Sequence, residues 1–588
     1  MKTLIVSINS KYIHSSLAAW YLKVCCGEEC GHVKVLEFTV NENADHILSS
    51  IYAEKADVAA FSCYIWNIET VIRLSQWLKG VTPGIKIVLG GPEVSFECDK
   101  LLEKFPFVDY IIPGEGEYAF SSLLKIINTG ARLLDDSYGI ACRTGSNIFY
   151  NNIYNLVEDL DCIPSPYTRE MLDSIGNRLV YFESSRGCPF SCSYCISSTF
   201  EGVRYFSLER VKQQLKLLMD TGIPMVKFVD RTFNCNRARA KEIFRYIIDN
   251  PSGTSFHFEA AADLFDDEML QLLTDIPEGL IQLEIGVQTT NGKTLEAINR
   301  RTDINKVFHN VERLRSKGNI HLHLDLIAGL PFEDHDSFKQ SFYEVYRLNP
   351  HNLQLGFLKL LKGSKIRSEA AQFGYVFKEQ PPYEMMSNSF IDFDGILELK
   401  KIEELLDRYC NSGRFAKTLG YAACFLFKSP YDFYRELMCY MEKAGFYNRS
   451  VSNKELYSLI TTFLKSIVSS EEIPLIKDLL KFDYLASDSS GSLPEGLQEE
   501  PDAGFRKKSF DFLTDEKNIR DYLPGFLGTP AKQIYKSVYL GLFNHDLTSY
   551  AEPGVYTRNK TVILFDYSKR NRVTGLYGFR KIDAGQFK

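Results

Sequence analysis

Three cysteines lie close together near the middle of the chain. Cys188, Cys192 and Cys195 follow a C-x-x-x-C-x-x-C pattern within the segment E-S-S-R-G-C-P-F-S-C-S-Y-C-I. Thiolates at such tight spacings typically hold iron–sulfur clusters, whereas closed zinc sites use four ligands. Since no fourth ligand is evident, three thiolates could hold three irons of a four-iron cluster and leave the fourth iron open to a chelating small molecule. A zinc loop or a chance spacing is the alternative.

The cysteine spacing resembles the signature of the radical S-adenosylmethionine (SAM) superfamily, and so does the aromatic Tyr194 just before the third cysteine. The resemblance implies that Cys188, Cys192 and Cys195 bind a 4Fe-4S cluster whose open iron binds SAM. It also implies that one electron cleaves SAM to methionine and a 5′-deoxyadenosyl radical. Reduced flavodoxin or ferredoxin is then the expected electron donor.

Strands and helices alternate around and after the cysteine segment. This alternation predicts a partial (β/α)6 barrel over residues 179–375, and barrel sites lie at the carboxyl ends of the strands. The six expected strands are Leu179–Ser184, Met225–Val229, Ser255–Glu259, Leu280–Ile285, Ile320–Ile327 and His351–Leu358.

Polar side chains stand at or just beyond these strand ends. Hydrogen-bond acceptors there suit ribose hydroxyls, and an arginine suits a carboxylate. The arrangement resembles oxygen-independent coproporphyrinogen oxidases and their broad subgroup, which implies SAM contacts for Glu259, Gln288, Arg300 and Asp325. Asp230 opens a D-R-T turn where the family usually has a Gly-Gly-Glu-like turn, and we count it as a further SAM candidate. For each single carboxylate the alternative is a structural salt bridge.

The first 150 residues also alternate between short apolar runs and helical stretches. Continuous apolar strands of this kind predict a doubly wound parallel sheet, which binds ligands outside the carboxyl ends of its strands. The expected strands are Thr3–Ile8, Val33–Phe38, Ala56–Ser62, Lys86–Gly90 and Asp109–Pro113. The segments that follow them are rich in small residues, which allow a large ligand to approach the backbone closely.

The motif G-G-P-x-x-S followed by G-E-G-E resembles the cobalamin-binding domain that precedes many radical SAM cores. The family's D-x-H-x-x-G motif is absent, so we expect cobalamin without a histidine ligand from this domain. His14 is the nearest histidine to a strand end and is therefore the candidate for a cobalt ligand. The alternative is a polar histidine at the surface or at a helix start. The cobalamin-binding candidates at the strand ends are Ser15, Ser62, Gly90, Gly91, Glu115 and Gly116.

The remaining segments complete the expected domain organisation. Residues 151–178 form a linker whose Pro164 and Pro166 discourage helix. Residues 376–588 form a mainly helical domain that resembles a domain of unknown function attached to some bacterial cobalamin-dependent radical SAM proteins. We expect this last domain to close the barrel mouth and shape the substrate pocket.

Composition narrows the class of protein. The chain of 588 residues has a net charge of −7, which gives no general basic surface and disfavours a nucleic-acid partner. We expect no signal peptide and no membrane span, because the apolar runs are too short. The 14 cysteines are scattered, which favours reduced thiols in the cytoplasm.

The leading hypothesis is a cobalamin-dependent radical SAM enzyme that methylates an unactivated carbon of an unknown small molecule. The nearest alternative uses the same cofactors for oxidation, cyclisation or ring rearrangement without methyl transfer. A methylthiotransferase is weaker, because its second cysteine pattern is not reproduced. A non-catalytic cobalamin- or metal-binding protein is the alternative from a different class.

Overall fold

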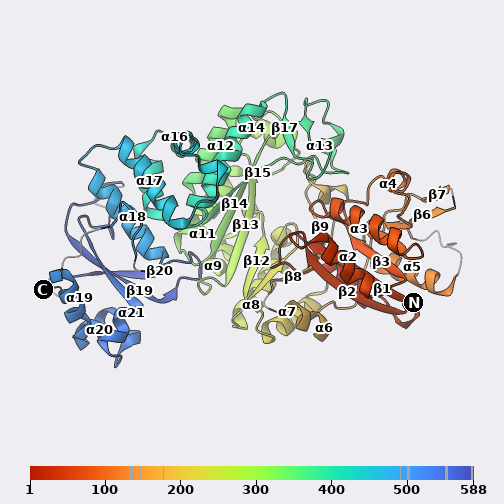
Figure 1. Ribbon diagram of the computed structural model, residues 1–588, viewed down its shortest axis with the longest axis horizontal. Helices are drawn as coiled ribbons and strands as arrows, with labels where there is room; N and C mark the ends of the chain where they lie inside the picture. The colour runs from red at the N-terminus through yellow and green to blue at the C-terminus, as the bar shows by residue number, and fades with distance from the viewer. Residues whose placement is uncertain are drawn as a thin grey trace.

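The computed structural model describes residues 1–130, 138–145, 147–176, 178–200, 202–490, 492–498, 503–549, 554–583 and 587. Figure 1 shows an N-terminal α/β domain at one end, a barrel-like sheet in the middle and a C-terminal region that ends in a small sheet at the other end. No helix in the described part of the chain is long and apolar enough to cross a membrane.

The N-terminal domain is built on a seven-stranded sheet of order β2-β1-β3-β4-β5-β6-β7. The first five strands in this order are parallel. Strand β6 runs antiparallel to β5, and β7 runs antiparallel to β6. Strand β1 is buried along nearly its whole length, because helices cover both faces of the sheet. The strands are β1 Lys2–Asn9, β2 His32–Thr39, β3 Val58–Ser62, β4 Lys86–Gly90, β5 Tyr110–Ile112, β6 Ala141–Thr144 and β7 Asn147–Phe149. The helices are α1 Leu17–Val24, α2 Ala44–Ala53, α3 Ile68–Val81, α4 Cys98–Lys104 and α5 Glu117–Thr129, and α6 Arg169–Ile175 follows in the linker.

The central domain is a six-stranded parallel sheet of order β15-β14-β13-β12-β11-β8. Buried apolar residues alternate along each strand with less buried polar ones, as in β13 (I-Q-L-E-I-G-V-Q). The apolar set packs under the helices, and the polar set lines the inside of the barrel. The strands are β8 Val180–Phe182, β11 Met225–Phe228, β12 Ser255–Glu259, β13 Ile281–Gln288, β14 His321–Ala328 and β15 Asn352–Phe357. The helices are α7 Leu208–Asp220, α8 Arg237–Asp249, α9 Asp267–Thr274, α10 Gly292–Ala297, α11 Ile304–Ser316 and α12 His335–Arg347.

The C-terminal region is mainly helical, and its last strands form an antiparallel sheet of order β18-β19-β20. The doubly wound sheet, the six-stranded partial barrel and this mainly helical region confirm the predicted fold class. The elements are α13 Lys365–Ser368, β16 Val376–Phe377, β17 Met385–Ser387, α14 Phe393–Leu405, α15 Ala416–Tyr421, α16 Pro430–Lys443, α17 Asn453–Ile467, α18 Ile473–Ser487, α19 Ala503–Thr514, α20 Glu516–Tyr522, α21 Ala531–Ser537, β18 Val538–Phe543, β19 Thr561–Arg570 and β20 Tyr577–Ile582.

The C-terminal region touches both ends of the barrel, which corrects part of the prediction for it. Its first part lies at the mouth, where Asn388 Nδ2 donates to the Gly329 carbonyl just beyond β14 at 3.0 Å. Its last sheet instead contacts the opposite end. Arg572, in the turn between β19 and β20, donates to Ser255 Oγ at the start of β12 and to Glu278 before β13. The final sheet therefore covers the amino ends of the strands and does not close the mouth.

Candidate cofactor-binding site

The cysteine loop connects two short antiparallel strands, β9 Ser185–Gly187 and β10 Val203–Tyr205. Gly187 has φ +97°, and a Cβ on it would lie 2.3 Å from the carbonyl oxygen of Gly202. Only glycine therefore allows the two strands to approach at the start of the loop. The strand pair follows directly after β8, so the loop begins at the carboxyl ends of the barrel strands.

Asp230 fixes the chain just before the cysteine loop. Its carboxylate is 1% exposed and accepts hydrogen bonds from the Ser184 amide at 3.0 Å and the Ser184 hydroxyl at 2.6 Å. The Ser185 hydroxyl donates to the same carboxylate. Burial raises the pKa of Asp230, and these three hydrogen bonds oppose the shift. In this geometry Asp230 holds the entry to the loop, and its predicted contact with SAM stays a prediction.

Arg300 lies against the cysteine loop. Its Nη1 lies 3.9 Å from Cys192 Sγ and 3.3 Å from the Tyr194 hydroxyl, and its Nη2 donates to the Gly286 carbonyl. Its Nε is buried and has no hydrogen-bond partner. A buried N–H group without a partner is costly, so this atom fits an acceptor such as the SAM carboxylate.

Gln288 shares this corner of the site. It has φ +72°, which is rare for a residue with a side chain, and follows a register shift between β13 and β14. A Cβ on Gly286 would lie 2.2 Å from Gln288 Nε2 and 3.7 Å from Arg300 Nη2, so the Gln288 amide folds over the bare glycine beside Arg300.

The thiols of Cys188 and Cys195, the other two cysteines of the loop, are half-buried. Cys188 Sγ lies 3.5 Å from Thr232 Oγ1.

Inside the barrel, the Glu259 carboxyl group forms no hydrogen bond with the residues that the structure describes. It ends β12 beside Glu284 of β13. Burial raises the pKa of Glu259 to about 7, while Arg231 opposes the shift and Glu284 and Asp325 add to it. A ligand that donates hydrogen bonds, such as a ribose, would satisfy this carboxyl group.

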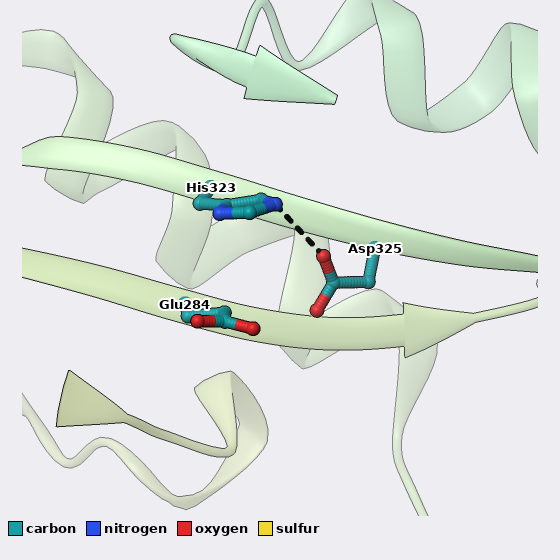
Figure 2. Close-up of side chains that lie close together, drawn as sticks. All are labelled: Glu284, His323 and Asp325. Carbon is teal, nitrogen blue, oxygen red and sulfur yellow. Dashed lines mark ion pairs between the residues drawn. The ribbon is translucent and has the colours of Figure 1, made fainter. Parts of the chain in front are cut away.

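A network of ionisable groups lies beside Glu259 inside the barrel, where Glu259, Glu284 and His323 are level in the strand register. Figure 2 shows His323 and Asp325 on one strand, joined by an ion pair of 3.0 Å, and Glu284 on the neighbouring strand. Lys227 Nζ and His257 Nε2 lie 3.1 and 3.0 Å from Glu284 Oε2. Burial alone would raise the pKa of Glu284, but His257 and Lys227 lower it to about 2.

The group of Glu284, His323 and Asp325 has the ligand types of a metal site. Their ligand atoms lie within 4.8 Å of one another. However, the Lys227 ammonium lies 3.1 Å from Glu284 Oε2, so a bound cation would be repelled there. We therefore interpret the group as an ion-pair network that holds Asp325 and the side chains beside Glu259 in place.

Sequence reasoning missed Lys227, His257 and His323. A signal was present, because polar residues alternate with apolar ones in β12 (S-F-H-F-E) and at the start of β14 (H-L-H-L-D). A period of two on a strand whose apolar face packs under helices places the polar face inside a barrel.

The N-terminal domain turns its strand ends toward this barrel. His14, in the loop after β1, places Nδ1 2.8 Å from the hydroxyl of Tyr181 on β8. The pKa of His14 is lowered by burial and by the nearby Lys11 and Lys227. Ser15 Oγ donates to the Leu179 carbonyl just before β8 at 3.1 Å. The loop at the carboxyl end of β1 therefore packs against β8, the edge strand of the barrel sheet.

The other cobalamin candidates lie on the same edge of the sheet. Ser62 ends β3, and Gly90 ends β4 beside it in register. Gly91 has φ +104°, and a Cβ on it would lie 2.7 Å from the Cys63 carbonyl oxygen, so the two loops meet at bare backbone. Ser95 Oγ accepts from the Gly114 amide at 3.0 Å and joins the next loop to this one. Such a bare edge fits a large flat ligand.

Glu115 pairs with arginines beside the cysteine loop, and its predicted contact with cobalamin stays a prediction. Its Oε2 lies 2.9 Å from Arg204 Nη1 and 3.4 Å from Arg186 Nη1, so it binds the strands on both sides of the cysteine loop. Burial opposes ionisation of Glu115, but the two arginines lower its pKa below the usual value. Glu117 also pairs with Arg186 at 2.6 Å. The acidic residues of G-E-G-E thus join the two domains, while Gly116 lies against Leu22.

Comparison with protein families accounts for most of the chain. Residues 3–124 match the B12 binding domain, and residues 182–342 match the radical SAM superfamily. Residues 371–565 match a protein family of unknown function, DUF4080. The chain therefore contains a B12 binding domain, a radical SAM domain and a C-terminal domain of unknown function. These domains confirm the expected cofactors, because they imply cobalamin, SAM and a 4Fe-4S cluster.

Individual relatives of this radical SAM protein cover only part of it. The cobalamin-dependent radical SAM methyltransferase TokK of Streptomyces tokunonensis is 28% identical over 53% of this chain and 47% of its own. An anaerobic magnesium-protoporphyrin IX monomethyl ester cyclase of Rubrivivax gelatinosus is 24% identical over 56% of this chain and 61% of its own. The chain thus spans about half to three fifths of these relatives.

A solved structure shares the fold over a longer range. The cobalamin-dependent S-adenosylmethionine radical enzyme OxsB, with aqua-cobalamin and S-adenosylmethionine bound, matches with a TM-score of 0.57 and 16% identity. The match covers 90% of this chain and 84% of OxsB. At this identity the likeness concerns the fold alone.

Proposed function

We propose that this protein is a cobalamin-dependent radical SAM enzyme that methylates an unactivated carbon of a small molecule. The observation that carries the proposal is the contact between His14 and Tyr181, which sets the strand ends of the B12-binding domain against the edge strand of the barrel. A substrate between them would reach both cofactors. The similarity to TokK supports methyl transfer as the reaction.

The bound groups would supply the reactive chemistry: a 5′-deoxyadenosyl radical from SAM and the cluster, and a methyl group from cobalamin. The protein would supply binding, orientation and exclusion of water. Cys188, Cys192 and Cys195 would ligate three irons as thiolates. The Arg300 guanidinium, 3.9 Å from Cys192 Sγ, would stabilise the charge of that thiolate and orient the SAM carboxylate through its free Nε.

Further residues would hold SAM from the barrel side. Glu259 and Asp325 would accept hydrogen bonds from the ribose, and the ion pair between Lys227 and Glu284 would keep the neighbouring carboxylates in place. Gln288 would present its amide beside Arg300. Tyr194 would pack on the loop, where its hydroxyl already meets Arg300 at 3.3 Å.

We also propose the setting of the reaction. Reduced flavodoxin or ferredoxin would supply the electron, and the protein would work in the cytoplasm. The 14 cysteines are scattered along the chain, which supports a reducing compartment.

The second candidate function keeps the same cofactors without methyl transfer. The similarity to a cyclase supports it. The ion-pair network of the barrel does not distinguish the two reactions, because both would begin with radical formation at the cluster.

The experiment uses reduced, cobalamin-loaded protein with SAM labelled on its methyl group and fractionated small-molecule extracts. We expect 5′-deoxyadenosine and a product that carries the label. 5′-Deoxyadenosine with an altered but unlabelled product would instead establish the second function. Absence of 5′-deoxyadenosine in protein with full iron and sulfide content would refute both and leave a non-catalytic cofactor-binding protein.

A further inference from the structure

The segment that follows the last barrel strand is hydrogen-bonded to the cysteine loop. The Ile366 amide donates to the Ser193 carbonyl at 2.9 Å, and Ser193 lies between the second and third cysteines. The Ser193 amide in turn donates to the Ile298 carbonyl at 2.9 Å. The loop between Cys192 and Cys195 is therefore fixed on two sides, and one of the two supports is the segment containing α13.

The same segment binds the B12-binding domain a few residues away. Lys362 Nζ lies 2.9 Å from Glu93 Oε1, and the Tyr383 hydroxyl donates to the same oxygen. Glu93 is 5% exposed and stands in the G-G-P-E-V-S loop after β4. A buried carboxylate needs such partners, since an unpaired charge there is strongly destabilising.

Packing makes this connection stiff. Gly363 has φ +79°, and a Cβ on it would lie 2.3 Å from the ring of Phe96, so the ring rests directly on the glycine backbone. Arg367 lies 4.7 Å from the centre of the Tyr383 ring and donates to the Leu360 carbonyl at 2.6 Å. These contacts fix the conformation of the segment 360–383, which touches both the cysteine loop and the B12-binding domain.

We propose that this segment, which we call the strut, sets the position of the Gly90–Ser95 loop relative to the cysteine loop, with Lys362 and Tyr383 as positioning residues for cobalamin. The strut is a continuous piece of chain that contacts Glu93 through Lys362 and Tyr383, and Ser193 through Ile366, which lies between them in the sequence. Its last part lies within the domain of unknown function, which thereby gains a role. The inference rests on the cofactors that the domains imply and not on the proposed methyl transfer.

The mechanism is electrostatic and steric. Without the Lys362 ammonium, Glu93 keeps a buried charge with only the Tyr383 hydroxyl beside it. The loop relaxes toward water to solvate that charge, and the bare backbone at Gly90 and Gly91 moves away from its place at the sheet edge. Cobalamin then binds a less organised site, while the cysteine loop keeps its own bonds to Ile366 and Ile298.

The test is a titration of full-length protein, reconstituted with iron and sulfide, with hydroxocobalamin followed by absorbance. Lys362→Met is expected to raise the cobalamin dissociation constant about tenfold, with unchanged iron and sulfide content. Lys362→Arg is expected to restore binding. Lys378→Met is the matched control, because Lys378 belongs to the same strut, is 51% exposed and, among the described residues, forms its side-chain ion pair with Glu384 alone, at 3.4 Å.

Two further measurements keep the result interpretable. Tyr383→Phe removes only the hydroxyl and is expected to weaken cobalamin binding by a smaller factor in an intact fold. Combining Lys362→Met with Glu93→Gln is expected to cost less than the sum of the two single changes, because the buried charge is gone. Unchanged cobalamin affinity in Lys362→Met, or an equal loss in Lys378→Met, would overturn the proposal and leave the proposed reaction untouched.

Discussion

Arg204 Nη1 lies 2.9 Å from Glu115 Oε2 and joins the B12-binding domain to the strand that leaves the cysteine loop. Arg186, on the strand that enters the loop, lies 3.4 Å from the same oxygen. One carboxylate therefore ties down both strands beside the three cysteines. This carboxylate is thus one of several groups that join the two cofactor domains, as are His14 and Glu117.

Replacing Glu115 with Gln should loosen this junction. The amide keeps the shape but loses the charge that two arginines share, at a cost of about 1–3 kcal/mol. Hydrogen exchange measured by mass spectrometry should show faster exchange over residues 185–205. Glu103→Gln, on the exposed side of α4, is the control and should leave that segment unchanged. Equal protection in both variants would show that the pair does not hold the junction.

Each of the three cysteines should be essential for the cluster. Cys188→Ala, Cys192→Ala or Cys195→Ala removes one of only three protein ligands, so iron and sulfide content should fall to background and SAM cleavage should stop. Cys162→Ser, at an exposed position in the linker, should keep both. The assignment fails if any one of the three alanine variants still cleaves SAM.

Arg300 should matter for SAM more than for the cluster. Arg300→Met removes the free buried Nε and the charge beside Cys192, and SAM affinity in equilibrium dialysis should fall about 10- to 100-fold. The neighbouring Arg301 is exposed, so Arg301→Met should bind SAM normally. Normal SAM binding in Arg300→Met would assign Arg300 a purely structural role on the loop.

The carboxyl group of Glu259 should make stability depend on pH. Burial raises its pKa to about 7 in the folded protein, so the folded state holds the proton more tightly than the unfolded state. Stability associated with the neutral form is complete below about pH 4 and is lost as the pH rises through about 7, by about 3 kcal/mol at most.

Glu259→Gln stays neutral and should not show this loss. The difference in unfolding free energy between variant and wild type, measured on the apoprotein by circular dichroism, should grow in favour of the variant from about pH 5 to about pH 8. Asp267→Asn, at a side chain 92% exposed, is the control. Parallel pH curves for Glu259→Gln and wild type would contradict the buried carboxyl group.

Arg572 should stabilise the barrel from its amino end without affecting the mouth. Arg572→Ala removes the bond to Ser255 Oγ at 3.0 Å and should cost about 1–2 kcal/mol of unfolding free energy. Formation of 5′-deoxyadenosine should stay at the wild-type rate, and Lys569→Ala should change neither property. A lower rate of SAM cleavage in Arg572→Ala would indicate that the last sheet acts on the mouth after all.

Much of this protein could be predicted from its sequence because the signals are local. The spacing of Cys188, Cys192 and Cys195 within one loop indicates a cluster, since the ligands of one metal group lie within a few residues. Alternation of apolar strands with helices indicates two parallel sheets, and parallel strands place the residues that follow them at one common edge. That geometry brought Glu259, Arg300 and Asp325 into one expected site.

Only the tertiary structure decided which domains touch, because those contacts join residues far apart in the chain. Nothing near Glu115 in the sequence indicates that its partner is Arg204, and nothing near Glu93 indicates Lys362. The final sheet likewise packs on the amino ends of the barrel strands through Arg572, although a mouth-closing role was expected. Sequence patterns fix which face of an element is buried, whereas the partner of that face depends on the packing of the whole chain.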